Sequence, residues 1–77
     1  MRTYTSKERE FNRKIGEKVK EYRTQNNVSQ QKLANELDIS ISTYIRKERG
    51  ESFFTAYEIA FVADYLKTRL DNFFPRI

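Results

Sequence analysis

QQKLANELDISISTYIRKERG, residues 30–50, decides the fold of this chain because it predicts two short helices joined by a tight turn. Leu33, Ala34 and Leu37 recur at the spacing that places side chains on one face of a helix, and polar residues occupy the opposite face. Ser29 stands just before this segment, where its hydroxyl can accept a hydrogen bond from an amide of the first turn. We therefore expect a helix over residues 30–37.

The second half of this stretch predicts another helix, over residues 41–49, whose surface is mostly polar. Residues 38–40, Asp-Ile-Ser, supply a break, an apolar anchor and a new N-cap. Only Tyr44 and Ile45 are placed to face a core. Such a helix either uses its exposed side for binding or is a solvated surface helix, and the pattern alone favours neither. Gly50 ends it as a C-cap, and the basic residues of the last turns suit the helix dipole.

This stretch and its flanks resemble the lambda-repressor-like helix-turn-helix family, the phage repressors and xenobiotic-response-element (XRE) regulators. The residues that carry the resemblance within the motif are Ser29, Gln30, Leu33, Ala34, Leu37, Ile39, Ser40, Ser42, Thr43, Glu48 and Gly50. The matching residues on the flanks are Ile15, Gly16, Val19, Tyr22 and Arg23 before the motif, and Leu66, Leu70, Asp71, Phe73 and Phe74 after it. The resemblance covers residues 15–74. It implies an all-α, compact five-helix domain that binds double-stranded DNA sequence-specifically.

The length and composition predict one small domain without redox or metal chemistry. A chain of 77 residues buries only about 60% of its unfolded surface, enough for one modest core. Cysteine and histidine are absent from the sequence, which excludes disulfides, thiolate or imidazole metal ligands, and nucleophiles or bases of these two types. No apolar run approaches the ~20 residues of a membrane span, and the N-terminus lacks the apolar stretch of a signal peptide. We expect a cytoplasmic protein with no cofactor, no metal and no catalytic residue.

The net charge of +4 is distributed unevenly along the chain. Residues 1–50 hold twelve basic and seven acidic residues, whereas residues 51–77 hold three and four. A basic surface suits phosphate binding, but many domains of other function have a similar balance. Charge alone therefore gives only modest support to nucleic-acid binding.

Residues 1–5 show no periodicity and predict a flexible arm, and residues 6–77 predict a single helix-turn-helix DNA-binding domain. Thr5 and Glu8 fit a capping box at the start of a helix over residues 6–25. The apolar stripe of this helix repeats at steps of four and three and consists of Phe11, Ile15, Val19 and Tyr22. Asn26 and Asn27 end the helix, since asparagine tolerates the left-handed conformation of a C-cap.

The last third of the chain predicts a loop and two more helices. Residues 51–54 form the loop, and Thr55 with Glu58 fits a second capping box before an apolar run. The side chains expected to bury along this helix are Ile59, Val62, Ala63 and Leu66, with Phe61 and Tyr65 on a neighbouring strip. Residues 69–74 predict a fifth, short helix that Pro75 ends. The sequence shows no strand periodicity, so we expect five helices.

Four residues of the second motif helix match the positions at which the family reads bases: Ile41, Ser42, Thr43 and Arg46. Such a helix enters the major groove with its N-terminal residues near base edges. Arg46 is the strongest candidate, because its guanidinium can bond O6 and N7 of guanine together, worth ~1–3 kcal/mol of discrimination. Ile41 cannot hydrogen-bond a base and would favour a thymine methyl group. The alternative interpretation of Ile41 is an exposed apolar residue without a role.

A second set of residues is expected to contact the DNA backbone: Ser29, Gln30, Lys32, Ser40, Arg49 and Ser52, together with Arg2. Gln30 enters this set through the resemblance, because the family's glutamine at this position braces against the backbone or an outer base. Ser29 and Ser40 are helix caps first, and phosphate contact is a second use of the same helix ends. For each basic residue a solvated surface charge is an equally weighted alternative.

The resemblance also implies a structural ion pair between Arg23 and Glu48, which ties the second motif helix to the first helix of the domain. Asp38 stands where the family prefers glycine, and the left-handed conformation costs Asp less than most residues. Lys47 stands where many relatives carry a large apolar residue. Either its methylene stem lies along the core and its ammonium reaches water, which we expect, or the helix rotates slightly. Tyr44, bulkier than the commoner valine or isoleucine, can fill the remaining gap.

The expected function is transcriptional repression by a homodimer on a pseudo-palindromic operator, because one motif helix covers too few base pairs for selectivity. Tyr65, Phe74 and Ile77 predict the dimer seam, and Leu70 and Phe73 are expected to close the core. No small-molecule ligand is expected.

The serious alternative is a protein-interaction module of the same fold, an antitoxin or antirepressor whose partner is a toxin or a repressor protein. An RNA-binding module is a more distant third. An enzyme is disfavoured, since the sequence has no paired carboxylates, nucleophile elbow or glycine-rich phosphate loop.

Overall fold

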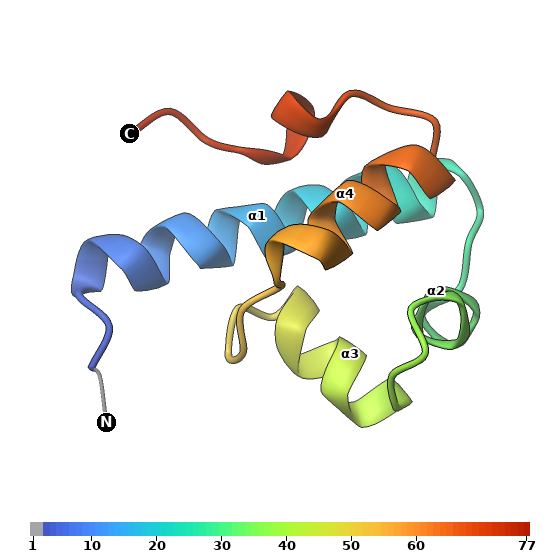
Figure 1. Ribbon diagram of the computed structural model, residues 1–77, viewed down its shortest axis with the longest axis horizontal. Coiled ribbons are helices and arrows are strands. Elements are labelled where there is room, and N and C mark those ends of the chain that lie inside the picture. Colours follow the sequence, from blue (N-terminus) through green and yellow to red (C-terminus); the bar gives the residue numbers. More distant parts are fainter. Residues whose placement is uncertain (1–2) are drawn as a thin grey trace.

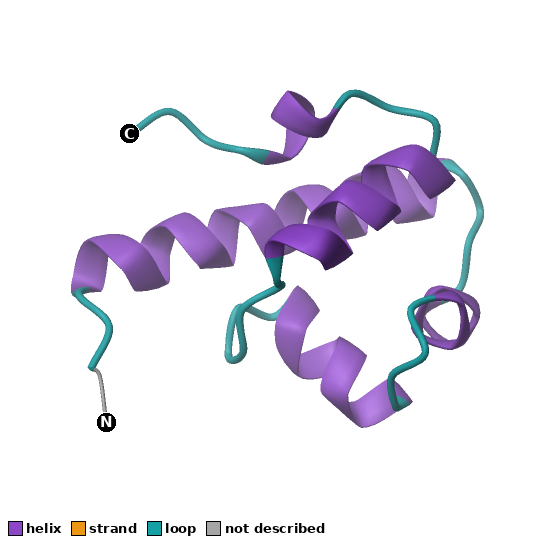
Figure 2. Ribbon diagram, in the orientation of Figure 1, coloured by secondary structure: helices purple, strands orange, loops and turns teal. Residues whose placement is uncertain are grey.

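The computed structural model describes residues 3–77, which form four α-helices and one 3₁₀ turn (Figure 1, Figure 2). The helices are α1 (Ser6–Gln25), α2 (Gln30–Glu36), α3 (Ile41–Glu48) and α4 (Ala56–Tyr65), and the turn is η1 (Leu70–Phe73). The all-α fold class is confirmed, but the prediction of five helices is wrong. The last segment, just before Pro75, is a 3₁₀ turn instead of a fifth α-helix. Its backbone hydrogen bonds span three residues, as in the bond from the Asn72 amide to the Arg69 carbonyl (3.1 Å).

Helices α1 and α4 form the middle of the domain, with α2 and α3 on one side and η1 with the C-terminal tail on the other (Figure 1). α1 contacts both α3 and η1, α2 contacts α3, and α4 contacts η1. The arrangement sets the helix-turn-helix side of the domain apart from the C-terminal tail. None of the helices formed by residues 3–77 has the length and apolar character needed to cross a membrane.

Each α-helix begins where a side-chain oxygen caps it, and all four predicted caps are confirmed. The capping residues are Thr5, Ser29, Ser40 and Thr55. Each accepts a hydrogen bond from the amide three residues further on. Both predicted capping boxes are present as well, because the carboxylates of Glu8 and Glu58 accept from the amides of the capping threonines.

A residue in the left-handed conformation follows each of the four α-helices. It lies at or near the predicted position after α1, α2 and α3, and at Lys67 (φ 56°), which the sequence does not predict, after α4. Asn27 (φ 57°) follows α1, and Asp38 (φ 58°) follows α2. The left-handed turn predicted at Asp38 is therefore confirmed, although aspartate carries a steric cost there that glycine would avoid. Gly50 has φ 82° after α3, as its predicted role as a C-cap requires.

The hydrophobic core draws on every element of the fold. Its buried members are Ile15, Val19, Leu33, Ala34, Tyr44, Phe54, Ile59, Val62, Ala63, Leu66 and Phe73. The prediction that Phe73 closes the core is confirmed, and its ring packs edge-on against Tyr22, with centroids 5.3 Å apart. The same prediction for Leu70 is wrong, since this side chain is 45% exposed. Leu70 begins η1, one turn before Phe73, and it meets solvent at this end of the turn while the Phe73 ring takes the place against the core.

Gly16 marks the closest approach of α1 and α3. A Cβ atom at this position would lie 2.3 Å from the carbonyl oxygen of Glu48, well inside van der Waals contact. The missing side chain lets α1 pack directly against the backbone at the C-terminal end of α3. This contact fixes where the two helices cross.

Candidate nucleic-acid interface

The helix-turn-helix consists of α2, the turn at residues 37–40, and α3 (Figure 1). The amide of Ile39 donates to the carbonyl of Ala34 at 3.0 Å, which closes the end of α2. The Ser40 hydroxyl then accepts from the amide of Thr43 at 3.1 Å and starts α3. Backbone and side-chain hydrogen bonds together fix the turn, so the two helices keep a defined relative orientation.

α3 divides into a buried face and an exposed face. Tyr44 and Glu48 are buried one turn apart, whereas Ser42 and Arg46 are exposed. Arg46 forms no ion pair within residues 3–77, in contrast to Arg49, whose guanidinium lies 3.9 Å from the Glu51 carboxylate. The exposed face of α3 therefore offers hydrogen-bonding groups that the described fold leaves available.

The first turn of α3 is more constrained than a free surface helix would be. Thr43 is half-buried, and its hydroxyl accepts a hydrogen bond from the Ser40 hydroxyl at 2.8 Å. Ile41 is also half-buried and packs against the core. The interpretation of Ile41 as a merely exposed apolar residue is therefore wrong. Ile41, rather than Ile45, joins Tyr44 in contacting the core.

A cluster of three buried side chains and one half-buried one, here called the Glu48 cluster, joins the first three helices. Arg23, Tyr44 and Glu48 are buried, and Gln30 is half-buried. Arg23 Nε donates to Glu48 Oε2 at 2.8 Å, and its terminal nitrogen donates to Oε1 at 3.3 Å. The Tyr44 hydroxyl donates to Oε2 at 2.6 Å, and Gln30 Nε2 donates to Oε1 at 2.9 Å. Each carboxylate oxygen thus accepts two hydrogen bonds, which fills the lone-pair sites of an ionised glutamate.

The Glu48 cluster holds fixed protonation states. Burial alone would raise the pKa of Glu48, but hydrogen bonds from Arg23, Tyr44 and Gln30 outweigh burial and hold this pKa below its ordinary value. Burial, followed by the hydrogen bond to Glu48, raises the pKa of the Tyr44 hydroxyl. Glu48 is therefore ionised and Tyr44 neutral around neutral pH, and the cluster anchors α3 to α1 and α2.

Gln30, which the sequence assigns to the DNA backbone, lies at the edge of this cluster. Its side chain is half-buried, and one hydrogen of its amide nitrogen is committed to Glu48. A side-chain amide has a second N–H and a carbonyl oxygen. The backbone contact stays a prediction, and it has to use these remaining groups.

Lys47 and Glu58 form a second buried ion pair, which the sequence does not predict. Lys47 Nζ lies 2.6 Å from Glu58 Oε1 and also donates to the carbonyl of Phe53 at 3.3 Å. The side chains are only 12% and 11% exposed, so the prediction that the ammonium reaches water is wrong. The capping box holds the Glu58 carboxylate inside the fold, where it neutralises the lysine. The pair ties α3 to α4.

The other residues assigned to the DNA backbone lie mainly on the surface. Lys32 is exposed and lies 3.5 Å from Glu36, one turn further along α2. Ser52 is half-buried, and its amide donates to the carbonyl of Arg46 at 3.2 Å, so this amide is already occupied. Ser29 is exposed and serves as the cap of α2. Arg2 lies outside the described residues, as does Met1 of the predicted arm.

The described part of the arm approaches the loop after α3. The ring of Tyr4 lies 4.3 Å from that of Phe53, and its carbonyl accepts from Arg9 at 2.7 Å. These contacts bring residues 4 and 53 together on one side of the domain.

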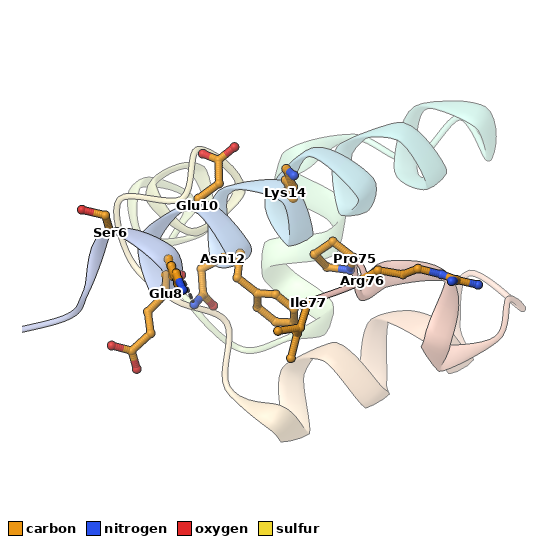
Figure 3. Close-up of a pocket in the computed structure, with 10 residues that line it drawn as sticks. Ser6, Glu8, Glu10, Asn12, Lys14, Pro75, Arg76 and Ile77 are labelled. Atoms are coloured by element: carbon orange, nitrogen blue, oxygen red, sulfur yellow. Dashed lines mark hydrogen bonds between the residues drawn. The ribbon is translucent and has the colours of Figure 1, made fainter.

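The three residues of the predicted dimer seam lie in two different places: Tyr65 lies on α4, whereas Phe74 and Ile77 lie beside α1. Tyr65 stacks on Phe61 of α4 at 6.2 Å, whereas Phe74 stacks on Phe11 of α1 at 6.1 Å. Ile77 lines a groove of about 630 Å³ between the first turns of α1 and the tail. Figure 3 shows Pro75 and Ile77 of the tail beside Asn12 of α1. Internal contacts therefore already engage one side of both aromatic rings.

Comparison with known proteins defines the class to which this fold belongs. A sequence model of the helix-turn-helix domain family matches residues 16–74, so the chain belongs to this family. The resemblance to lambda-repressor-like helix-turn-helix proteins is confirmed.

Two solved structures share the fold in particular. The DNA-binding domain of BldD is 22% identical, with a TM-score of 0.73 over 86% of this chain and 96% of that one. The S. venezulae BldD DNA-binding domain is also 22% identical, with a TM-score of 0.72 over 86% and 99% of the two chains. No curated protein matches this chain in sequence.

Proposed function

We propose that this chain is a transcriptional repressor that binds a pseudo-palindromic operator in double-stranded DNA as a homodimer, with α3 as the recognition helix. The observation that carries the proposal is the division of α3: its buried face is fixed by the Glu48 cluster, and its exposed face carries Ser42 and Arg46. A helix held this rigidly presents its exposed side chains in one orientation, as base reading requires. The likeness to BldD DNA-binding domains supports the proposal at the level of the fold.

Base reading falls to Ile41, Ser42, Thr43 and Arg46 in this proposal. Arg46 forms the main contact, since its guanidinium has no internal ion pair within the described residues and can bond guanine at two atoms. Ser42 is exposed and can donate to or accept from a base edge. Ile41 and Thr43 are half-buried, so they act through the parts of their side chains that remain accessible, such as methyl contacts with thymine.

Backbone contacts fall to Ser29, Gln30, Lys32, Ser40, Arg49 and Ser52. Lys32 and Arg49 are exposed, and their internal ion pairs are long enough to be exchanged for phosphates. Each neutralised phosphate adds about −0.9 to the slope of log K against log salt. Affinity is therefore expected to fall between low and physiological salt, and a titration with no change would contradict this part of the proposal.

Residues 6–77 act as one domain in this proposal. The caps and the core draw on α1 to η1 together, so a truncation that removes any of these elements is expected to unfold the remainder.

A protein-interaction module is the second candidate function, and one observation favours it. Tyr57 on α4 is 72% exposed, and tyrosine is a residue type enriched at protein interfaces. An antitoxin or antirepressor could place this side chain in its contact with a toxin or a repressor protein.

The deciding experiment is selection of bound sequences from a random duplex pool, with Arg46→Ala selected in parallel. The repressor proposal predicts an enriched motif for the parent and a motif with one weakened position for the variant. The absence of any enriched sequence for the parent would contradict base-specific binding and favour the interaction module.

A further inference from the structure

An aromatic strip follows one side of α4 and consists of Tyr57, Phe61 and Tyr65. The three residues stand four apart, which places them in one line along the helix. The ring centroids are 6.2 Å apart in both steps, and the rings of Phe61 and Tyr65 are within 11° of parallel. Tyr57 is 72% exposed and the other two are half-buried. The strip is therefore one continuous apolar surface rather than three scattered residues.

The helix that carries the strip bears very little charge. Its charged residues are Glu58, which is neutralised by Lys47 inside the fold, and Asp64, which is exposed. α4 contains no lysine or arginine. Base stacking on aromatic rings works together with cations that hold the sugar-phosphate backbone, so this surface does not suit a nucleic acid. Its chemistry suits another protein surface.

We propose that the strip is the homodimer seam and that a second copy of this chain covers it, an inference that rests on the proposed function. α4 has no basic residue and one exposed charge, Asp64, so a contact between two α4 helices brings few like charges together in a chain of net charge +4. The order Tyr-Phe-Tyr also reads the same in both directions. Two strips that meet antiparallel about a two-fold axis place Tyr57 against Tyr65 twice and Phe61 against Phe61.

Small residues beside the strip permit a close approach of the two helices. Ala56 and Ala60 are both exposed on α4 and present no bulk to an incoming helix. Three aromatic side chains bury at most about 150–250 Å² each, and these are already partly covered. The strips alone supply less than the ~1,200–2,000 Å² of a stable interface. The dimer is therefore weak in free solution and is completed on DNA.

The proposed seam on α4 is coupled directly to α3, the proposed recognition helix. Tyr44 of α3 shares the core with Ile59 of α4, and Lys47 is paired with Glu58. A two-fold axis at α4 therefore sets the separation and orientation of the two α3 helices.

This assignment keeps Tyr65 of the seam predicted from the sequence but leaves out Phe74 and Ile77, which lie beside α1 rather than in line with Tyr57 and Phe61 on α4. The groove beside Ile77 is then not part of the contact.

Sedimentation velocity of the full chain over a concentration series tests the seam. The variants are Phe61→Asp on the strip and, as a matched control, Leu70→Asp at another exposed apolar side chain. Circular dichroism and thermal unfolding check that both remain folded. In free solution the parent and Leu70→Asp are expected to approach twice the monomer mass at high concentration, whereas Phe61→Asp stays monomeric. On a duplex with two half-sites the parent and Leu70→Asp are expected to fill both sites together, whereas Phe61→Asp fills them one at a time. A parent that is monomeric in both conditions, or a Phe61→Asp variant that associates like the parent, would overturn the proposal.

Introduced thiols test the antiparallel geometry, because the chain has no cysteine of its own. Phe61→Cys is expected to form a disulfide-linked dimer under mild oxidation, and Tyr57→Cys only when mixed with Tyr65→Cys. Phe74→Cys serves as the control and should cross-link at least about tenfold more slowly than Phe61→Cys, since thiols bridge only when their Cβ atoms are close. Faster cross-linking of Phe74→Cys than of Phe61→Cys would show that the seam lies at the C-terminal tail instead of at α4.

Binding of the same variants to a single half-site separates this inference from the proposed function. If the seam is wrong, half-site affinity remains and the cross-links fail. If DNA binding is wrong, the cross-links still form and half-site affinity is absent for every variant.

Discussion

Two buried ion pairs hold α3 in the domain, and their carboxylates are satisfied in different ways. Glu48 receives donors from three helices, and its partner Arg23 is also held by the carbonyl of Val28 at 2.7 Å. Glu58 receives one long, flexible side chain, Lys47, and an amide of its own capping box. The difference indicates that the Glu48 cluster holds α1, α2 and α3 rigidly together. The Lys47–Glu58 pair is a more flexible link between α3 and α4, and breaking it should cost less free energy of unfolding.

The largest expected effect comes from removing the carboxylate of Glu48, the partner of Arg23. Glu48→Ala leaves the guanidinium of Arg23 buried without its counter-charge, which should lower the free energy of unfolding by about 3–5 kcal/mol. Glu58→Ala should cost less, about 1–3 kcal/mol, because the Lys47 stem can turn its ammonium toward water. Urea titrations of both variants measure the two losses.

Glu58→Gln is the control that separates charge from capping, since its side-chain oxygen can still accept from the Thr55 amide. It should retain more of the stability than Glu58→Ala. Equal losses of unfolding free energy for Glu48→Ala and Glu58→Ala would contradict the view that the Glu48 cluster is rigid and the Lys47–Glu58 pair flexible.

The next effect concerns the place where α1 crosses the backbone of Glu48. Gly16→Ala introduces a Cβ atom 2.3 Å from the Glu48 carbonyl oxygen, so the helices must separate. Alanine normally stabilises a helix interior relative to glycine, but overpacking here should cost about 1–3 kcal/mol net. Thermal unfolding measures it, with Lys18→Ala on the exposed face of α1 as a near-neutral control. A Gly16→Ala variant more stable than the parent would show that α1 and α3 are not in this contact.

A smaller effect, with a characteristic pH dependence, is expected from the hydroxyl of Tyr44. Tyr44→Phe leaves one lone pair of Glu48 unfilled and should cost about 1–2 kcal/mol at neutral pH. The folded-state pKa of Tyr44 lies above its unfolded value near 10, so its stabilisation is present below that pH and is lost as the pH rises further.

Glu48 affects stability at the acid end of the pH range. Its folded-state pKa lies below the unfolded value near 4.3, so its contribution is present above that pH and is lost as the pH falls through the folded pKa. Urea unfolding between acid and alkaline pH should show the parent losing stability at both ends, and Tyr44→Phe should lose less than the parent at the alkaline end. An unchanged alkaline limb in the variant would indicate that the hydroxyl does not bind Glu48.

The sequence predicts the helices of this fold well because their boundaries are set locally. The oxygens of Thr5, Ser29, Ser40 and Thr55 cap amides only three residues away, so a short window contains all the information. The left-handed turn at Asp38 is equally local. The exception is η1, where a short segment before Pro75 forms a 3₁₀ turn that its apolar pattern does not distinguish from an α-helix.

Of the contacts between helices that position the candidate site, the Arg23–Glu48 ion pair is expected, and only through the family resemblance. The other contacts depend on how the helices cross, and the sequence does not predict them. Gln30 meets Glu48 across 18 residues, and Lys47 meets Glu58 across 11. A lysine at an apolar position of α3 was the one available signal for the second pair, but the sequence alone does not show which carboxylate faces it. Gly16 likewise matches the family pattern without revealing that the backbone of α3 lies against it.

The central claim, that the exposed face of α3 reads bases while other cations hold the backbone, is tested most directly by comparing Arg46→Ala with Arg49→Ala. Both arginines are exposed on or next to α3, so each serves as the control for the other. Affinities are measured for the selected site and for a scrambled duplex at one salt concentration. Arg46→Ala should lose ~1–3 kcal/mol on the selected site and little on the scrambled one, whereas Arg49→Ala should weaken both alike. Equal losses from the two variants on both duplexes would contradict the claim.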